Sequence, residues 1–595
     1  MVSAMKSLTR FRAALLAALA VPACDRAPAP TLVTVAEQSG FARTGRIEEV
    51  EALCAAFQQA WPAQVRCIEF GRSPENRPML ALVASSDGVI DPAAARERAR
   101  PVVLMQGGIH AGEIDGKDAG FLAMRQILEG TAAGGALARV TLVFVPVFNV
   151  DGHERFGRWN RPNQTGPEEM GWRTTAQNLN LNRDYVKADA PEMRAMLRLL
   201  GEWDPILYAD LHVTDGAQFE HDVSITGGPT LVGDDELRKA GLGLREELVR
   251  RLSAQGSLPV DFYPDFVAQD DPASGFAVSV SQARFSDGYW PRRNRLAILV
   301  ETHSWKDYPT RVRVTRNAMI AMLELAAANG AQWLAAARGA DQRAARIGGT
   351  SVALAYANTD HVRTIDFRGY AYTRQASAIS GGLATRYDTT KPQVWHVPLR
   401  DEVRPSIAVV APRGGYIVPA ADAAWVGEKL ALHGIASRVL ASGISNLDVE
   451  VFRATKATLA PATFEGHAIR SVEGEWTPER RVVPPGSLFV PIAQAKSQLV
   501  LTLLEPRGPD SLVSWGFFNA AFEPKEYMEP YVADALGVEV LKTDAHARQE
   551  FERRLRDDPE FAKSPAARLE FFYRRHPSWD DRLNLYPVLR VEREP

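Results

Sequence analysis

The sequence has few cysteines, no excess of one charge and no long apolar run. Only three cysteines occur among 595 residues, which excludes a small disulfide-rich scaffold. The 69 basic and 72 acidic side chains nearly cancel, and no long Lys/Arg-rich run creates a basic patch, so nothing favours nucleic acid as a partner. Because 46% of the residues are hydrophobic and 24% are charged, wholesale disorder and a polytopic membrane protein are also excluded. At roughly 150 residues per domain, the length predicts two to four domains.

The N-terminal segment has the order of features that export requires. Three basic residues precede an apolar run at residues 13–21, which is too short to span a bilayer. A small residue and Cys24 follow, as in a bacterial lipoprotein signal, which this segment resembles. We therefore expect a signal peptide over residues 1–24, a linker over 25–34, and an exported protein that is periplasmic or tethered to a membrane through lipidated Cys24. Plain secretion and an ordinary buried N-terminal helix are the alternatives.

The other two cysteines, Cys54 and Cys67, would then lie in a compartment that permits disulfides. They could form one disulfide, or they could be two small buried side chains. The sequence leaves both open because it does not give the separation of their Cα atoms.

The first half of the chain alternates between strand-like and helix-like stretches. This rhythm predicts an α/β fold with a mixed or largely parallel sheet between helices, and active residues on loops at strand ends. Strands are expected at residues 65–70, 79–85, 101–105, 140–147, 206–212 and 296–302, and helices at 47–61 and 113–128. A long helical tract over 311–346, broken near Asn329 and Gly330, would close a first domain at residues 35–346.

Beyond residue 346 the pattern changes to short apolar runs bounded by Gly, Pro and charged residues. One helix is expected at residues 421–433, and an amphipathic, charged helical part at 527–573. Residues 347–595 are therefore predicted to form an accessory α+β domain, β-rich first and then helical.

Candidate metal ligands concentrate in the first half. His110 follows a predicted strand, and Glu113 opens the next helix, so an N and an O donor three residues apart can converge on one ion. This spacing alone is weak evidence. His212 ends another strand and supplies a third donor, with Asp210 on the same strand face to orient it. Three protein ligands leave a fourth position for water, which is typical of catalytic rather than structural zinc.

A carboxylate and two guanidinium groups accompany this set. Glu301 stands at the mouth of a buried apolar strand, where an unpaired carboxylate is costly unless it is functional. Arg173 and the pair Asn182-Arg183 lie between the predicted ligands in sequence.

The order of these residues resembles the M14 family of zinc metallocarboxypeptidases over roughly residues 35–340. The resemblance implies a metallocarboxypeptidase-like fold, one Zn²⁺ per chain, and peptides as substrates. The oligomeric state is not implied. The matching elements are His110 and Glu113, the string Pro146-Val-Phe-Asn149-Val-Asp151-Gly152, Arg173, Asn182-Arg183, His212, Glu301, and the approach segment at residues 70–78.

The resemblance also implies a role for each residue. Glu301 would be the general base, and Arg173 would bind the oxyanion. Asn182 and Arg183 would bind a terminal carboxylate, although the pair could merely brace a loop. Tyr289 is a weak match to the tyrosine that commonly closes over the substrate in this family, and packing is its expected role.

Two other functions remain as alternatives. A zinc-dependent deacylase of the aspartoacylase type would use the same three ligands and a glutamate base. A non-catalytic cell-surface binding protein would require the loss of a ligand or of the base. Because every one of these residues is present in peptidase order, a carboxypeptidase is the preferred prediction.

Overall fold

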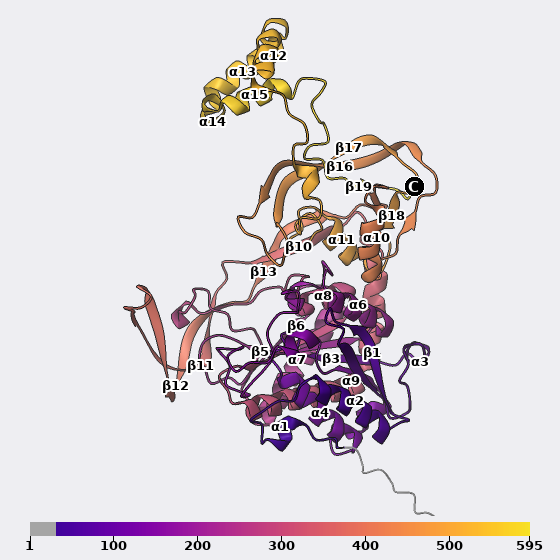
Figure 1. Ribbon diagram of the computed structural model, residues 1–595, viewed down its shortest axis with the longest axis vertical. Coiled ribbons are helices and arrows are strands. Elements are labelled where there is room, and N and C mark those ends of the chain that lie inside the picture. The colour runs from indigo at the N-terminus through magenta and orange to yellow at the C-terminus, as the bar shows by residue number, and fades with distance from the viewer. Residues whose placement is uncertain (1–30) are drawn as a thin grey trace, which may run out of the picture.

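The computed structural model describes residues 31–595. The predicted signal peptide at residues 1–24, Cys24 and the start of the predicted linker lie outside the described residues. Figure 1 shows an α/β body made by the first half of the chain, a β-rich body above it, and a group of helices that projects at the far end.

The α/β body is built on one eight-stranded sheet. In spatial order its strands are β1 (Val65–Arg72), β2 (Pro78–Ala84), β4 (Thr141–Val145), β3 (Val102–Gly107), β5 (Leu207–Thr214), β9 (Leu296–His303), β6 (Val223–Gly228) and β7 (Pro259–Val260). The central strands β4, β3, β5 and β9 run parallel to one another. β1 pairs antiparallel with β2, β2 with β4, and β6 with β9, whereas the edge strand β7 runs parallel to β6. The central strands are buried along their whole length, which explains their near-continuous apolar sequences.

Helices flank this sheet, and the arrangement confirms the predicted fold class. They are α1 (Val35–Gln38), α2 (Ile47–Ala60), α3 (Pro92–Glu97), α4 (Asp115–Leu128), α5 (Val150–Glu154), α6 (Pro191–Trp203), α7 (Asp235–Ala254), α8 (Ser286–Tyr289) and α9 (Tyr308–Ala344). Helix α9 packs against both α4 and α7, whereas α6 packs against β1. Within residues 31–595, no helix combines the length and apolarity that a membrane span requires.

The break predicted in the last helix of the α/β body, α9, is wrong. Helix α9 runs unbroken through Asn329 and Gly330 for 37 residues. The Asn329 side chain donates to the Leu325 carbonyl one turn earlier, and a Cβ on Gly330 would come within 2.7 Å of the Pro101 ring. Gly330 therefore allows close packing rather than ending the helix.

Cys54 on α2 and Cys67 on β1 form a disulfide, so the pairing alternative is the one found in the structure. The Cα atoms lie 5.5 Å apart, within the usual range for a bridge. This bond ties the first long helix to the edge of the sheet.

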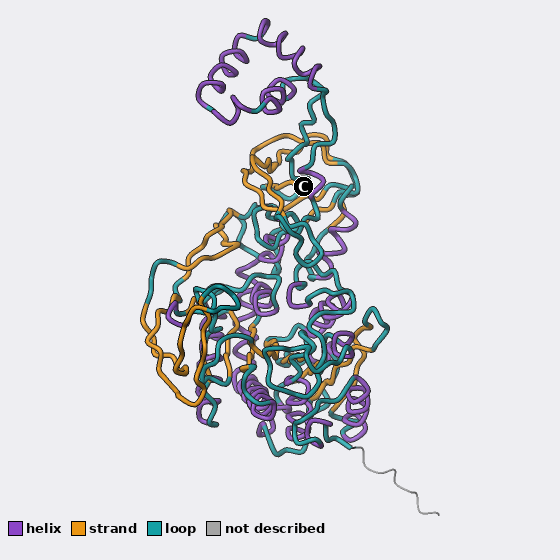
Figure 2. Tube along the Cα trace, turned by 60° about the vertical axis from the view of Figure 1, so that its left-hand side comes forward, coloured by secondary structure: helices purple, strands orange, loops and turns teal. Residues whose placement is uncertain are grey.

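The β-rich region has longer strands than the short runs predicted from the sequence. β10 (Ser351–Asn358) pairs with β13 (Val403–Val410), and a long hairpin consists of β11 (Arg363–Ala376) and β12 (Leu383–Arg400). Much of this hairpin is exposed on both faces, so its sequence lacks the alternation that marks a half-buried strand. The end of β12 pairs with β8 (Phe276–Ala277), which brings the hairpin onto the α/β body (Figure 2).

A six-stranded sheet and two groups of helices complete the chain. The strands are β15 (Arg438–Val439), β18 (Leu488–Pro491), β14 (Gly415–Val418), β19 (Leu589–Val591), β16 (Ile444–Leu459) and β17 (Arg470–Val483). The helices are α10 (Ala423–Leu432), α11 (Ser497–Leu504), α12 (Pro530–Thr543), α13 (Ala545–Asp557), α14 (Pro559–Lys563) and α15 (Pro565–Tyr573). The last four pack on one another and project from the sheet in both views (Figures 1 and 2). The domain boundary at residues 346 and 347 stays a prediction.

Candidate metal centre and active site

Three neighbouring parallel strands bring the candidate residues to one edge of the sheet. His110 follows β3, His212 lies near the end of β5, and Glu301 stands directly opposite His212 on β9. Because the carboxyl ends of parallel strands share an edge, residues more than 90 positions apart in sequence meet there.

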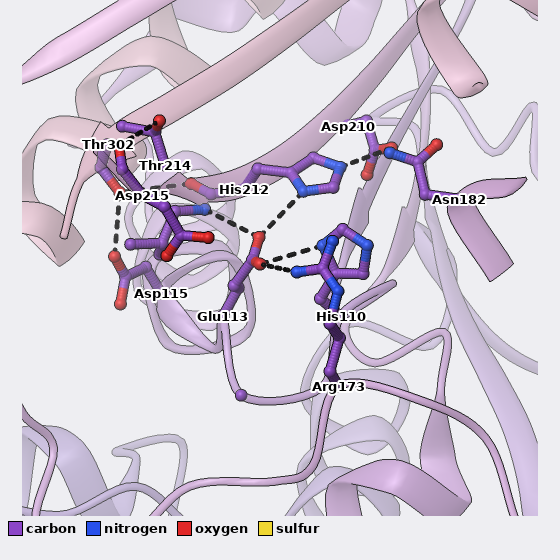
Figure 3. A network of polar contacts seen from close by, with 12 residues as sticks. His110, Glu113, Asp115, Arg173, Asn182, Asp210, His212, Thr214, Asp215 and Thr302 are labelled. Carbon is purple, nitrogen blue, oxygen red and sulfur yellow. Dashed lines mark hydrogen bonds and ion pairs between the residues drawn. The ribbon is translucent and has the colours of Figure 1, made fainter. Parts of the chain in front are cut away.

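His110, Glu113 and His212 form a compact set of metal-ligand atoms. The His110 Nδ1 atom lies 2.9 Å from Glu113 Oε1, and the His212 Nδ1 atom lies 2.9 Å from Glu113 Oε2 (Figure 3). One ligand atom from each residue lies within 4.8 Å of the others, and all three side chains are buried. Two nitrogens and one carboxylate are a donor set that suits Zn²⁺.

The outer nitrogen of each imidazole lies close to a side-chain oxygen. His110 Nε2 lies 3.1 Å from the Asn180 Oδ1 atom, and His212 Nε2 lies 2.9 Å from the Asp210 carboxylate. A proton held on Nε2 leaves the Nδ1 lone pair free to bind a metal ion. Burial lowers the pKa of His110 to about 4 in the metal-free protein, so its ring is neutral, as a ligand must be.

Glu113 is held by more than the two imidazoles. The Val213 backbone N–H donates to Oε2 at 3.1 Å, and the Arg161 and Arg173 guanidinium groups lie 3.1 and 3.2 Å from Oε1. Burial alone would raise the pKa of Glu113, but His110 and Arg161 outweigh it and hold that pKa well below its usual range. The carboxylate is therefore ionised and fixed in place.

Glu301 has no such partners. Its side chain is buried, yet it accepts no hydrogen bond and forms no ion pair within residues 31–595. Burial raises the pKa of Glu301 to about 8 in the metal-free protein, against the opposing effect of His212. A buried, unpartnered carboxyl beside a metal-ligand set has the environment of a general base.

One comparison with known proteins agrees with this geometry. The sequence model of the family described as "zinc carboxypeptidase" matches residues 50–241. Residues 50–241 belong to the zinc carboxypeptidase family. The match includes the three candidate ligands and supports a metallopeptidase, and it ends before Glu301. Among curated proteins, none matches the sequence.

Solved carboxypeptidase structures show a distant likeness to about half of this chain. A metallo-carboxypeptidase from Burkholderia cenocepacia is 18% identical, with a TM-score of 0.34 over 47% of this chain and 69% of that one. Carboxypeptidase A from Helicoverpa armigera is 17% identical, with a TM-score of 0.36 over 48% and 75%. Bovine thrombin-activatable fibrinolysis inhibitor is 13% identical, with a TM-score of 0.36 over 48% and 97%. Likeness at this level adds no argument about activity.

In this family region, the Asn149–Gly152 string positions Arg173. The Asn149 amide donates to the Arg173 carbonyl at 3.2 Å. A Cβ on Gly152 would come within 2.5 Å of the Thr174 carbonyl, so only glycine permits this approach. The Arg173 side chain is 35% exposed, which leaves part of it accessible to solvent beside the buried Glu113.

Asn182 and Arg183 lie in different surroundings. The Asn182 amide oxygen accepts from the Ser286 backbone N–H at 3.0 Å, and its side chain lies beside Asp210 and His212 (Figure 3). The Arg183 guanidinium stacks on the Phe285 ring at 4.3 Å and donates to the Asn182 carbonyl. Within residues 31–595, the Arg183 guanidinium makes no hydrogen bond to another side chain, whereas the Asn182 amide is neutral.

Several site residues escaped the sequence reasoning. Arg161 has no distinguishing sequence context, although it lies against both Glu113 and Asp215. Asn180 belongs to the same short string as Asn182, and its place in that string was the only sequence feature that could have marked it as a site residue. Tyr263 comes next to the site through a hydrogen bond of 3.0 Å from the Thr214 hydroxyl.

Tyr289, the weak match to the substrate-closing tyrosine, is fully buried. Its hydroxyl lies 2.9 Å from His433 Nδ1, under the β-rich body. The packing role expected for it is the one it has.

Proposed function

We propose that this chain is a zinc-dependent carboxypeptidase that hydrolyses the last peptide bond of a substrate with a free C-terminus. The observation that carries the proposal is the convergence of His110, Glu113 and His212, with the unpartnered Glu301 opposite His212. About one Zn²⁺ per chain is expected.

A zinc ion bound by these three residues would acidify a water molecule and polarise the scissile carbonyl. Glu301 would accept the proton of the attacking water and return it to the leaving amine. Its raised pKa makes it a stronger base than an exposed glutamate, and a cation bound nearby would keep it ionised at neutral pH. Glu301 would thus act in the carboxylate form.

Arg173 and Arg161 both contact Glu113, but they differ in access. Arg161 is almost fully buried between Glu113 and Asp215, so it serves to hold the ligand. Arg173 is partly exposed beside Glu113, where its guanidinium would donate to the oxygen on which charge develops during attack.

Arg183 would bind the terminal carboxylate. Burial lowers the pKa of Arg183 to about 10, so the group stays charged at neutral pH, and no carboxylate of residues 31–595 lies within 4.0 Å of it. A partly buried guanidinium without an anionic partner is costly. A substrate carboxylate would remove that cost through a bidentate contact.

Amidating the C-terminus of a peptide is expected to lower kcat/KM by about 10-fold to 1000-fold, because the Arg183 guanidinium would lose its anionic partner. Paired acid and amide peptides with the same residues provide the measurement. Arg183→Ala should lose the preference for the acid, whereas Arg173→Ala should slow both substrates. Equal cleavage of acid and amide by the unchanged enzyme would leave an endopeptidase or amidase instead.

Export is part of the same proposal, with a lipid tether at Cys24. The Cys54–Cys67 disulfide supports it, because such bonds persist in oxidising compartments. The full chain expressed in a Gram-negative bacterium should fractionate with membranes, and Cys24→Ser should release it or leave it unprocessed. A soluble cytoplasmic location of the unchanged protein would rule out export.

A further inference from the structure

Glu465 stands at the tip of the hairpin between β16 and β17, in a conformation that the turn itself does not favour. Reciprocal backbone hydrogen bonds of 2.9 and 3.0 Å join Phe464 and His467 around it. Glu465 and Gly466 both have positive φ, at 49° and 79°. Asn-Gly is the preferred pair for such a two-residue turn, and a glutamate there adopts a left-handed conformation at some cost. Local turn chemistry therefore does not account for Glu465.

Polar contacts hold this hairpin tip against the α/β body, next to the candidate active site. The Asn180 backbone N–H donates to Glu465 Oε2 at 2.8 Å, and His467 Nε2 lies 2.6 Å from the Asp189 carboxylate. Phe464 packs below the Arg284 guanidinium, which the Asp510 carboxylate holds at 2.7 Å. The β-rich body thus contributes a carboxylate that contacts Asn180, and Asn180 lies two positions before Asn182 and three before Arg183 in the chain.

Glu465 and Arg183 carry opposite charges, and neither forms an ion pair with a described residue. Within residues 31–595, no Lys, Arg or His nitrogen lies within 4.0 Å of the Glu465 carboxylate, and Arg183 likewise has no carboxylate at that distance. They are close enough for Glu465 to raise the pKa of Arg183, although burial lowers it more. Two unmatched charges that do not pair with each other can be bridged by a ligand that carries both signs.

We propose that Glu465 is a specificity-determining residue that the β-rich body supplies to the active site. It receives a cationic group on the terminal residue, whose carboxylate binds Arg183. The substrates are therefore peptides that end in lysine, arginine or another diamino acid. This inference rests on the proposed carboxypeptidase function. An acidic terminal residue would be repelled by Glu465, and a neutral one would leave it unmatched.

The experiment compares three peptides that differ only in a C-terminal Lys, Leu or Glu, with the full-length zinc-loaded enzyme. The unchanged enzyme should prefer Lys to Leu in kcat/KM. Glu465→Gln keeps an oxygen that can accept from the Asn180 N–H but removes the charge, so the Lys/Leu ratio should fall by about 10-fold to 100-fold. Glu465→Lys should move the preference toward the peptide that ends in Glu.

Glu475→Gln is the matched control, since it removes the same charge from an exposed position on β17. It should leave the Lys/Leu ratio as it is. If Glu465→Gln slows the Lys and Leu peptides equally, Glu465 only positions the Asn180 turn, and the specificity assignment is overturned. An unchanged enzyme that cleaves Lys and Leu ends equally well would overturn the inference alone. An unchanged enzyme that cleaves none of the peptides with a free C-terminus would overturn the proposed function as well.

Discussion

Glu301→Gln is expected to lower kcat by about 100-fold or more while the protein keeps its zinc. The amide preserves the shape of the side chain but cannot accept the proton of the attacking water, which is where a general base contributes its rate enhancement. Loss of the charge should not unfold the protein, because the Glu301 carboxyl accepts no hydrogen bond within residues 31–595. The measurement is kcat on a peptide with a free C-terminus, together with the metal content of the same sample.

Glu202→Gln provides the control for this substitution. Glu202 lies exposed near the end of α6, and its side chain forms no ion pair with any described residue. Full activity in Glu301→Gln would identify a different base. If Glu301→Gln loses both its zinc and its activity, Glu301 is a metal ligand, and the set of three donors is wrong.

His110→Ala and His212→Ala are each expected to reduce bound zinc from about one per chain to a small fraction, and activity by about 1000-fold or more. Each substitution removes one of only three protein donors, and a site with two donors holds zinc weakly. Metal analysis of the purified protein and kcat/KM on the same peptide provide the two readouts. A variant that keeps both full metal and full activity would disprove the ligand assignment.

His361→Ala is the matched control, because His361 is exposed in a loop far along the chain from these donors. The fold should survive removal of the metal. A catalytic body of some 300 residues buries enough apolar surface to remain folded without it. A chelator should therefore abolish activity but leave the circular dichroism spectrum and the Cys54–Cys67 disulfide unchanged.

Much of the α/β body could be predicted from the sequence. The central strands β3, β5 and β9 are apolar along their length because both of their faces are covered, and such runs are visible without any tertiary information. The helix break predicted at Gly330 is wrong, because its outcome depends on tertiary contacts that the sequence does not show. Whether a glycine ends a helix or admits a neighbour depends on what lies across from it, and here that is Pro101.

The candidate donors were also predictable, since each follows or ends a recognisable strand. What the sequence could not show is what surrounds them. Arg161 reaches Glu113, and Asn180 reaches His110 across 70 residues. Neither contact follows from local spacing, because it depends on how loops fold back over the sheet edge.

The sequence by itself determined the strand rhythm, the order of metal-ligand residue types and the family to which residues 50–241 belong. These features follow from short-range periodicity and from residue types at strand ends. Only the tertiary structure decided which charges have partners and which do not. Glu465 approaches Asn180 across 285 positions of the chain. Such a contact exists because the two sheets pack together, and their packing depends on side chains distributed over the whole molecule rather than on any one segment.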